Sequence, residues 1–386
     1  MNYLKGVLGA KVACFFYEKT ETDVKGSFRG NDGYDVCALA QKFGGGGHVK
    51  AAGCHHFRTH CQSQGNGSGR GGKNAVKKNL RRYCFLDGIF NIYKEKGFTS
   101  HDVVAIVRRT IHMKKVGHTG TLDPDAEGVL PVCVGKATKL SDVIMDGRKS
   151  YRAMLRLGVT TTTEDASGEV LETKAVVFDE GKIRAAVAAF IGRLEQVPPM
   201  YSAVKVNGKK LYELAREGKE IARKARTIEV YDIRIRRFLP PDRVEMDIDC
   251  SKGTYIRTLC ADIGKALGCG GHMAELLRTA TGSFSLENAI KLDDLKALAE
   301  QERAEDALLT MQEALRDFPV IKIAEGSTKL LYNGGKIQEK YFTKQPKALQ
   351  EDEIAAVYDF ENHLVGLYTL KKEETNFYIK PFKMLV

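Results

Sequence analysis

The chain has 386 residues, enough for two or three domains with separate cores, and 43% of them are hydrophobic, which excludes a wholly disordered protein. We expect no membrane association, because no apolar run reaches the roughly 18 residues of a spanning helix and the start soon becomes charged. The formal net charge of +11 suits a polyanionic partner about as well as it suits a merely soluble basic protein.

The nine cysteines are scattered along the sequence, and their number is odd. In a chain of this size, such usage argues against a disulfide scaffold and for a reducing compartment. We therefore expect a cytoplasmic protein.

Composition changes along the chain predict four segments. Residues 63–87 are dominated by Gly, Ser, Asn and basic residues, which cannot form a core and predict a flexible linker. Residues 1–62, before the linker, form a short Gly-rich and His-rich unit. Residues 88–316 have clear periodicity, and a softer break separates them from the last segment, 317–386.

Within the first segment, residues 27–54 read SFRGNDGYDVCALAQKFGGGGHVKAAGC. This stretch resembles the nucleic-acid-binding lobe of DHH-family phosphoesterases, such as oligoribonucleases of the NrnA type. The glycines before His48 would let backbone amides approach a phosphate closely. The Asp-His-His metal motif of that family is absent, so no hydrolase activity is implied. We hypothesise that the chain joins the tail of one gene product to a second protein, by genuine fusion or through a frameshift or gene-model error.

Five potential metal ligands gather where the first segment meets the linker: Cys54, His55, His56, His60 and Cys61. Their spacing does not match the usual pairs of close zinc ligands. We expect no metal here and interpret the stretch as irregular.

The third segment begins with helical periodicity. Valines and an isoleucine over residues 99–111 lie on one helical face, with Thr99 or Ser100 as the N-cap. Residues 151–157 then alternate apolar and polar side chains, which predicts a half-buried strand.

Elements of both kinds follow in the rest of this segment. Residues 244–250 alternate as a strand with one wet face, and residues 256–267 form an apolar helical stripe that stops at Gly268. The stretch from Lys291 to Arg316 is expected to be helical. Such interspersed elements predict an α+β domain with a mixed, mainly antiparallel sheet.

The stretch VGHTGTLDPDAEGVLPV, residues 116–132, carries the most information. Its glycines and prolines predict a shaped loop rather than a regular element. Asp123 precedes Pro124, whose ring disfavours helical backbone at the residue before it, so Asp123 should be extended. A carboxylate on such a rigid turn can meet a bulky substrate, although a bare Asp-Pro pair is more often a structural turn.

The wider pattern reverses that preference. Residues 116–132 are similar to the catalytic motif of the TruB family of tRNA pseudouridine synthases, and the resemblance runs in colinear order from Gly88 to Thr281. The other matching stretches are residues 91–104, 149–168, 197–218 and 250–264. One departure is Lys94-Glu95, where the family often has Lys-Pro.

The resemblance implies a pseudouridine synthase catalytic domain that isomerises the uridine at position 55 in the T arm of tRNA. The reaction demands no redox cofactor or metal. The partner would be the T-stem loop of tRNA, bound by a monomer that flips the uridine out of its stack. Strand-like runs in residues 317–386, including 330–337 and 355–370, predict a small β-barrel that resembles the PUA-like RNA-binding domain of this family.

The resemblance implies a role for each residue that matches a family motif. Asp123 matches the essential aspartate, and whether it acts as a nucleophile or as a base stays open. Arg257 matches the arginine that pairs with this carboxylate, and Tyr151 matches the tyrosine that stacks on the target base. His118 matches a histidine involved in extruding the uridine. Supporting roles fall to Lys94, Asp165 and Tyr255.

Phosphate contacts should supply much of the affinity for RNA. Lys114 and Lys115 lie beside the catalytic motif, and a second basic strip runs from Lys205 to Arg226. A solvated helix face is the alternative for that strip. Two alternatives also remain for the whole chain: a non-catalytic RNA-binding or tRNA-folding module on the same scaffold, and a nuclease acting through the first segment.

Overall fold

The computed structural model divides the chain into two compact units, Met1–Gly72 and Lys73–Val386. The residues it describes are 12–20, 23–30, 36–41, 46–48, 51–55, 86–202, 204–206, 208–219, 221–345, 350–373 and 376–386. Of the predicted linker, all but Leu86 and Asp87 lie outside these ranges. No helix within the ranges combines the length and the apolar character needed to cross a bilayer.

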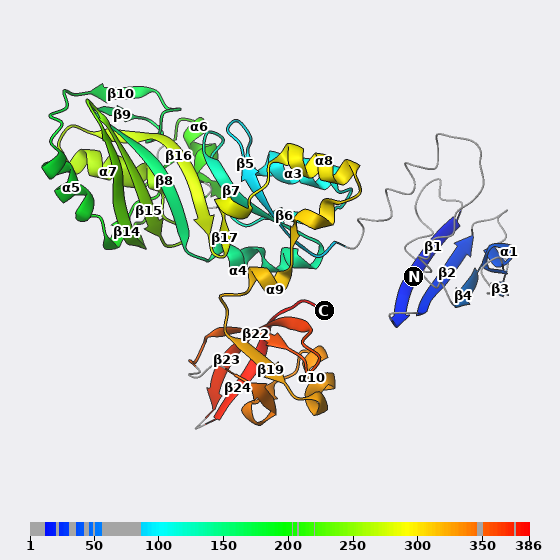
Figure 1. The fold of residues 1–386 in the computed structure, drawn as a ribbon. Coiled ribbons are helices and arrows are strands. Elements are labelled where there is room, and N and C mark those ends of the chain that lie inside the picture. Colours follow the sequence, from blue (N-terminus) through cyan, green and yellow to red (C-terminus); the bar gives the residue numbers. More distant parts are fainter. Residues whose placement is uncertain are drawn as a thin grey trace. The chain divides into compact units, whose positions relative to one another are not determined.

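The first unit contains a four-stranded antiparallel sheet in the order β1-β2-β4-β3 (Figure 1). The elements are β1 Val12–Thr20, β2 Asp23–Gly30, α1 Val36–Gln41, β3 Gly46–His48 and β4 Ala51–His55. Helix α1 packs against β3 and β4. Of the potential zinc ligands, Cys54 and His55 end β4, while His56, His60 and Cys61 lie outside the described residues.

The second unit is built on a ten-stranded sheet whose main path runs β11-β14-β15-β8-β16-β7-β5-β18. Its neighbours are antiparallel except for β16 and β7, which are parallel. The predicted mixed, mainly antiparallel sheet is therefore confirmed. The strands are β5 Gly88–Lys94, β6 Val116–His118, β7 Glu127–Val134, β8 Lys149–Leu157, β11 Gly192–Gln196, β14 Arg226–Leu239, β15 Arg243–Cys250, β16 Gly271–Thr281, β17 Phe284–Ser285 and β18 Leu308–Leu309. Two separate two-stranded ribbons are β9 Val159–Thr161 with β10 Val170–Thr173, and β12 Lys205–Val206 with β13 Lys209–Lys210.

Helix α3, Ser100–Thr110, begins at the N-cap that the sequence predicts, and α7, Ile256–Ala266, ends where its apolar stripe was expected to stop. In α3, the Asp102 backbone N–H donates to the Thr99 side chain, and Asp102 accepts from the Thr99 N–H in return. Helix α7 buries its apolar stripe and ends before Gly268, as predicted. Figure 1 shows α7 and α5 beside β14, β15 and β8. The other helices are α4 Ser141–Met145, α5 Glu180–Ala188, α6 Leu211–Arg216, α8 Leu292–Glu300 and α9 Met311–Ala314.

Two sequence predictions in this unit are wrong in part. The stretch from Lys291 to Arg316 is not one helix, because Glu302 adopts a positive φ of 60° after α8 and Leu308–Leu309 then pair with β5. Residues 116–132 are not a loop throughout, because their two ends pair with each other as β6 and β7. Only residues 119–126 form the loop between these strands.

The C-terminal residues form a second sheet in the order β20-β24-β23-β22-β19-β21. It is a nearly closed, barrel-like arrangement around its own apolar core, so the predicted PUA-like fold is confirmed. Residues 330–337, predicted as strand-like, begin instead inside a helix, and only Ile337–Gln338 pair with β24. The elements are β19 Val320–Ile323, α10 Thr328–Tyr332, β20 Ile337–Gln338, β21 Phe342–Lys344, β22 Ile354–Tyr358, β23 Leu364–Glu373 and β24 Asn376–Met384.

The C-terminal sheet contacts the large sheet through the segment that follows β7. This segment consists of the 3₁₀ helix η3, Gly135–Leu140, and α4. Lys139 Nζ donates to the carbonyl of Met384 at 2.6 Å, and Lys383 pairs with Asp142 at 2.7 Å. Apolar side chains of both sheets share one buried cluster around these contacts.

Candidate active site

Asp123 lies on the loop of residues 119–126, which buried side chains hold in place from below. The Ser100 hydroxyl donates to the Leu122 carbonyl and accepts from the Leu122 N–H, at 3.2 and 2.9 Å. Lys94 Nζ donates to the carbonyls of Pro124 and Ala126, at 3.0 and 2.6 Å. The Ala126 N–H also donates to the Asp123 carbonyl and closes the turn. The loop is therefore rigid where it presents Asp123.

Arg278, on β16, holds the same loop from its other side. Its side chain is 1% exposed, and its Nε donates to the Val129 carbonyl at 2.6 Å, while Nη2 reaches the Gly120 carbonyl at 3.4 Å. Sequence analysis did not single out Arg278. An arginine within a strand is usually a surface residue. The one available signal was that Arg278 occupies a position of β16 whose side chain is buried.

The carboxylate of Asp123 faces the guanidinium of Arg257, the second residue of α7. Arg257 Nε lies 3.2 Å from Asp123 Oδ2, and the Asp123 side chain keeps 40% of its surface exposed whereas Arg257 keeps 7%. Burial raises the pKa of Asp123 above its ordinary value, and Arg257 opposes that rise. A solvent-accessible carboxylate is thus held beside a fixed cation.

Asp165 fixes the other side of this guanidinium. Arg257 Nη1 lies 3.3 Å from Asp165 Oδ2, and Nη2 donates to the Tyr201 carbonyl at 2.8 Å. The second oxygen of Asp165 accepts from the hydroxyls of Thr163 and Ser167. Asp165 therefore orients Arg257 instead of facing solvent itself.

Tyr151, on β8, is nearly fully buried, and burial raises its pKa to about 12. Its hydroxyl forms a hydrogen bond with Arg278, and it lies close enough to Asp123 for the carboxylate to raise its pKa further. The tyrosine therefore stays neutral at physiological pH, close to the loop that carries Asp123.

His118 ends β6, immediately before the loop. Its ring lies 5.3 Å from that of His101, and its Nδ1 accepts from the Gly120 N–H at 3.3 Å. Burial, with His101 and Arg278 nearby, lowers the pKa of His118 below its ordinary value. The neutral imidazole then carries its proton on Nε2 and can act as a hydrogen-bond donor.

The family comparisons agree with this geometry. Residues 108–256 match the model of the TruB family pseudouridylate synthase N-terminal domain, and residues 257–318 match the tRNA pseudouridylate synthase B C-terminal domain. The tRNA pseudouridine synthase B of Alkaliphilus oremlandii is 48% identical over 301 residues, which are 78% of this chain and 99% of that protein. The chain belongs to the TruB family of pseudouridine synthases.

The fold is also similar to that of solved structures. A chain of a Cbf5–Nop10–Gar1 complex is 28% identical with a TM-score of 0.64, over 81% of this chain and 87% of that one. A chain of an H/ACA RNP bound to a substrate RNA is 25% identical with a TM-score of 0.62, at the same coverage. Residues 1–56 match the DHHA1 domain, so the resemblance of the first segment to the DHH family is also confirmed.

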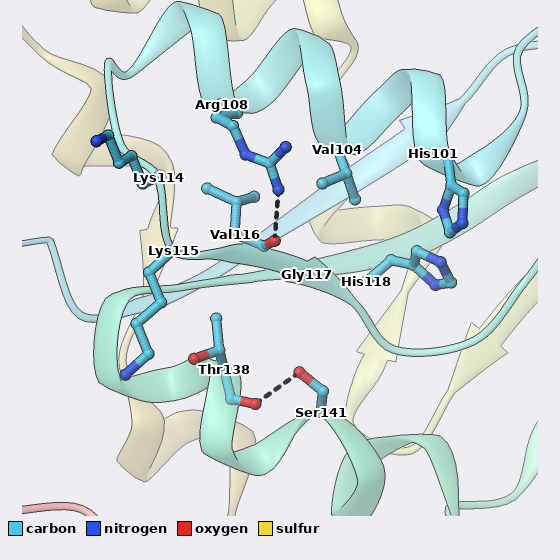
Figure 2. Close-up of a pocket in the computed structure, with 10 residues that line it drawn as sticks. All are labelled: His101, Val104, Arg108, Lys114, Lys115, Val116, Gly117, His118, Thr138 and Ser141. Carbon is cyan, nitrogen blue, oxygen red and sulfur yellow. Dashed lines mark hydrogen bonds between the residues drawn. The ribbon is translucent and has the colours of Figure 1, made fainter.

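Not all of the residues predicted from the TruB motifs gather in one place. Asp123, Arg257 and Asp165 form one ion-paired group, with Tyr151 and Lys94 close to its loop. Tyr255 caps α7, where its backbone exchanges two hydrogen bonds with the Gln196 side chain. The other predicted binding residues divide into His118, Lys114 and Lys115, which line a groove beside the loop (Figure 2), and Lys205, whose side chain lies outside the described residues.

A possible metal site lies elsewhere. Asp359, Glu361 and His363 bring potential ligand atoms together in the turn between β22 and β23. The Asp359 carboxylate already accepts from the Tyr332 hydroxyl and the His363 N–H, at 2.9 and 2.8 Å. These hydrogen bonds account for the cluster as a structural turn, and we assign no metal to it.

Proposed function

We propose that this chain converts the uridine at position 55 in the T arm of tRNA to pseudouridine, with Asp123 as the carboxylate at the reacting sugar. The single observation that carries the proposal is the pairing of a solvent-accessible Asp123 with the buried guanidinium of Arg257. The name of the Alkaliphilus relative supports tRNA as the substrate.

The reaction breaks the N1–C1′ bond of uridine and forms a C5–C1′ bond, while C5 loses a proton and N1 gains one. The detached base has to turn without leaving the site. Asp123 can serve this reaction by attacking C1′ or by taking a proton from the sugar. Arg257 keeps the carboxylate ionised and aimed, because Asp165 fixes the guanidinium from behind.

The base reaches this carboxylate only when it leaves the RNA stack, which costs a few kcal/mol. Tyr151 offers an aromatic wall that offsets part of that cost. His118, at the edge of the loop, is placed to fill the space that the uridine vacates.

We further propose that the enzyme acts as a monomer in the cytoplasm. Free, buried thiols at Cys133, Cys250 and Cys260 suit a reducing compartment.

The test is to incubate the protein with an unmodified tRNA transcript and to map pseudouridine along it. We expect modification at position 55 by the wild type, and a loss of turnover of at least ~10²–10⁴-fold with Asp123→Asn, whose tRNA affinity should change little. Tight binding without product by the wild type would instead favour the non-catalytic RNA-binding alternative.

A further inference from the structure

The start of helix α7 is held by a side chain from a distant strand. Gln196, the last residue of β11, is 4% exposed, and its amide contacts the backbone of Tyr255, the N-cap residue of α7. The Tyr255 N–H donates to Gln196 Oε1 at 2.8 Å, and Gln196 Nε2 donates to the Tyr255 carbonyl at 3.0 Å. Sequence analysis did not single out Gln196, since 59 positions separate the two residues and no local pattern joins them.

This contact replaces the cap that α7 lacks. Within the described part of the chain, the Tyr255 side chain makes no capping hydrogen bond to the first turn of α7, and unsupported helix ends fray. A glutamine amide presents one donor and one acceptor side by side, so it can pair with both backbone groups of one residue, as a neighbouring strand would. The Tyr255 carbonyl also accepts the Leu259 N–H at 3.0 Å, as part of the helix. Gln196 therefore fixes the residue from which the helix starts.

The segment that begins at Gln196 also holds the guanidinium that this helix carries. Further along the segment, the Tyr201 carbonyl accepts from Arg257 Nη2 at 2.8 Å. Two buried prolines lie between these contacts, and their rings restrict the backbone there. Residues 196–201 therefore hold α7 at two points, the backbone of Tyr255 and the side chain of Arg257.

The position of the helix start matters at Asp123. Arg257 is the second residue of α7, so its backbone lies in the turn that Gln196 supports. Arg257 Nε lies 3.2 Å from Asp123 Oδ2, and this ion pair favours the charged form of the carboxylate. A displacement of the helix start by about 1 Å would lengthen the contact, and misplacements of that size can reduce rates about 10²-fold.

We propose that Gln196 is a positioning residue for the Asp123–Arg257 pair, because its amide fixes the start of α7 where the guanidinium meets the carboxylate. The proposal rests on the function proposed above and adds a buried residue that acts through another. Gln196 should therefore affect catalysis only as long as Arg257 is present.

A double-mutant cycle on tRNA modification tests this dependence. Gln196→Met keeps the length of the side chain and removes the amide, so it should reduce kcat roughly tenfold while KM changes little. In an Arg257→Gln background, the same change should reduce kcat by less than about twofold, since the residue through which Gln196 acts is already lost. Equal losses in the two backgrounds would overturn the proposal.

The pH profile gives a second readout. Arg257 lowers the pKa of Asp123, so a displaced guanidinium should shift the acid limb of kcat/KM upward in Gln196→Met. The other charged or titratable groups near Asp123, which this variant leaves in place, are Asp165, Lys94, Asp125 and Tyr151. An acid limb at the wild-type position in folded Gln196→Met would contradict the positioning role.

Leu194→Ala, on the same strand, is the matched control. Leu194 packs against the core, so its truncation should lower Tm without changing kcat or the acid limb. Hydrogen exchange of the Tyr255 N–H in the wild type tests the contact even where a Gln196 variant fails to fold. This proton should exchange slowly, and exchange as fast as in an unfolded peptide would overturn the proposal. Absence of pseudouridine with the wild type, together with a protected Tyr255 N–H, would instead sink the proposed function.

Discussion

Arg257 is shared between two carboxylates: its Nε lies 3.2 Å from Asp123, while its Nη1 lies 3.3 Å from Asp165. The pair Asp123–Arg257 is open to solvent on the aspartate side only, because Arg257 is buried and Asp165 is largely covered. The two carboxylates therefore have different roles. Removing the charge of Arg257 and removing the charge of Asp165 should shift the pKa of Asp123 in opposite directions.

Arg257→Gln and Asp165→Asn should move the acid limb of kcat/KM in opposite directions. Arg257 lowers the pKa of Asp123, so its loss should keep the carboxyl protonated to a higher pH and shift the limb upward. Asp165 raises the pKa of Asp123, so its neutralisation should shift the limb downward. Loss of the guanidinium should reduce kcat by about 10²-fold, whereas Asp165→Asn should reduce kcat less, because the carbonyls of Thr163 and Tyr201 still hold Arg257 in place. Profiles of kcat/KM against pH that move in the same direction would contradict this account.

Lys94→Met should remove a pH-dependent part of the stability. Lys94 is fully buried, and burial lowers its pKa to about 8 from 10.5. Between these values the unfolded chain binds the proton and the folded chain does not, so the unfolding free energy contributed by this group rises with pH. The wild type should gain about 3 kcal/mol relative to Lys94→Met across that window. Denaturant unfolding at several pH values measures the difference, and parallel curves would refute the prediction.

Arg278→Met should disorder the catalytic loop from behind. The change leaves the carbonyls of Val129 and Gly120 without their buried donor, at a cost of about 1–3 kcal/mol for each. We expect kcat to fall while tRNA affinity changes little, because Arg278 is buried away from the RNA. Denaturant unfolding and the rate of tRNA modification measure the two effects, and wild-type values of both in Arg278→Met would contradict the role of Arg278.

Gly128→Ala should be far more damaging than Gly192→Ala, although both glycines have similar positive φ values of 107° and 112°. A Cβ at Gly128 would lie 2.2 Å from the Arg278 carbonyl oxygen, where β7 and β16 pair in parallel, whereas a Cβ at Gly192 meets nothing within 4 Å. Gly192→Ala should therefore cost only the backbone strain of about 1–2 kcal/mol. Thermal unfolding of both variants measures the loss of stability, and the difference between them is the cost of the clash at Gly128. Equal losses of stability in the two variants would contradict the prediction.

Deletion of residues 1–84 should leave tRNA modification near normal, but deletion of residues 1–87 should destabilise the enzyme. Leu86 belongs to the buried core of the large unit, and the Asp87 carboxylate accepts from the Lys136 N–H at 2.5 Å. Loss of the Leu86 side chain and of this acceptor should cost about 2–4 kcal/mol. Unfolding curves and pseudouridine yields compare the two truncations. A severe loss with the shorter deletion would mean that the first unit is an integral part of the enzyme.

Features that depend on neighbours along the chain could be predicted before the structure was known. The capping box of Thr99 and Asp102, the apolar stripe of α7 and the alternation of β8 are all local, so periodicity and side-chain chemistry were enough to predict them. The motif around Asp123 likewise predicted the turn on which this carboxylate lies, because its glycines and prolines act locally.

The surroundings of that loop, in contrast, depend on how distant segments pack. Leu308–Leu309 become a strand because β5 offers them an edge, although their local sequence favoured a helix. Arg278 meets Gly120 and Tyr151 only because β16 lies between β7 and β8. The groove beside His118 needs α3 and α4 at the correct separation. Contacts between residues far apart in the chain depend on packing, and no local pattern encodes them.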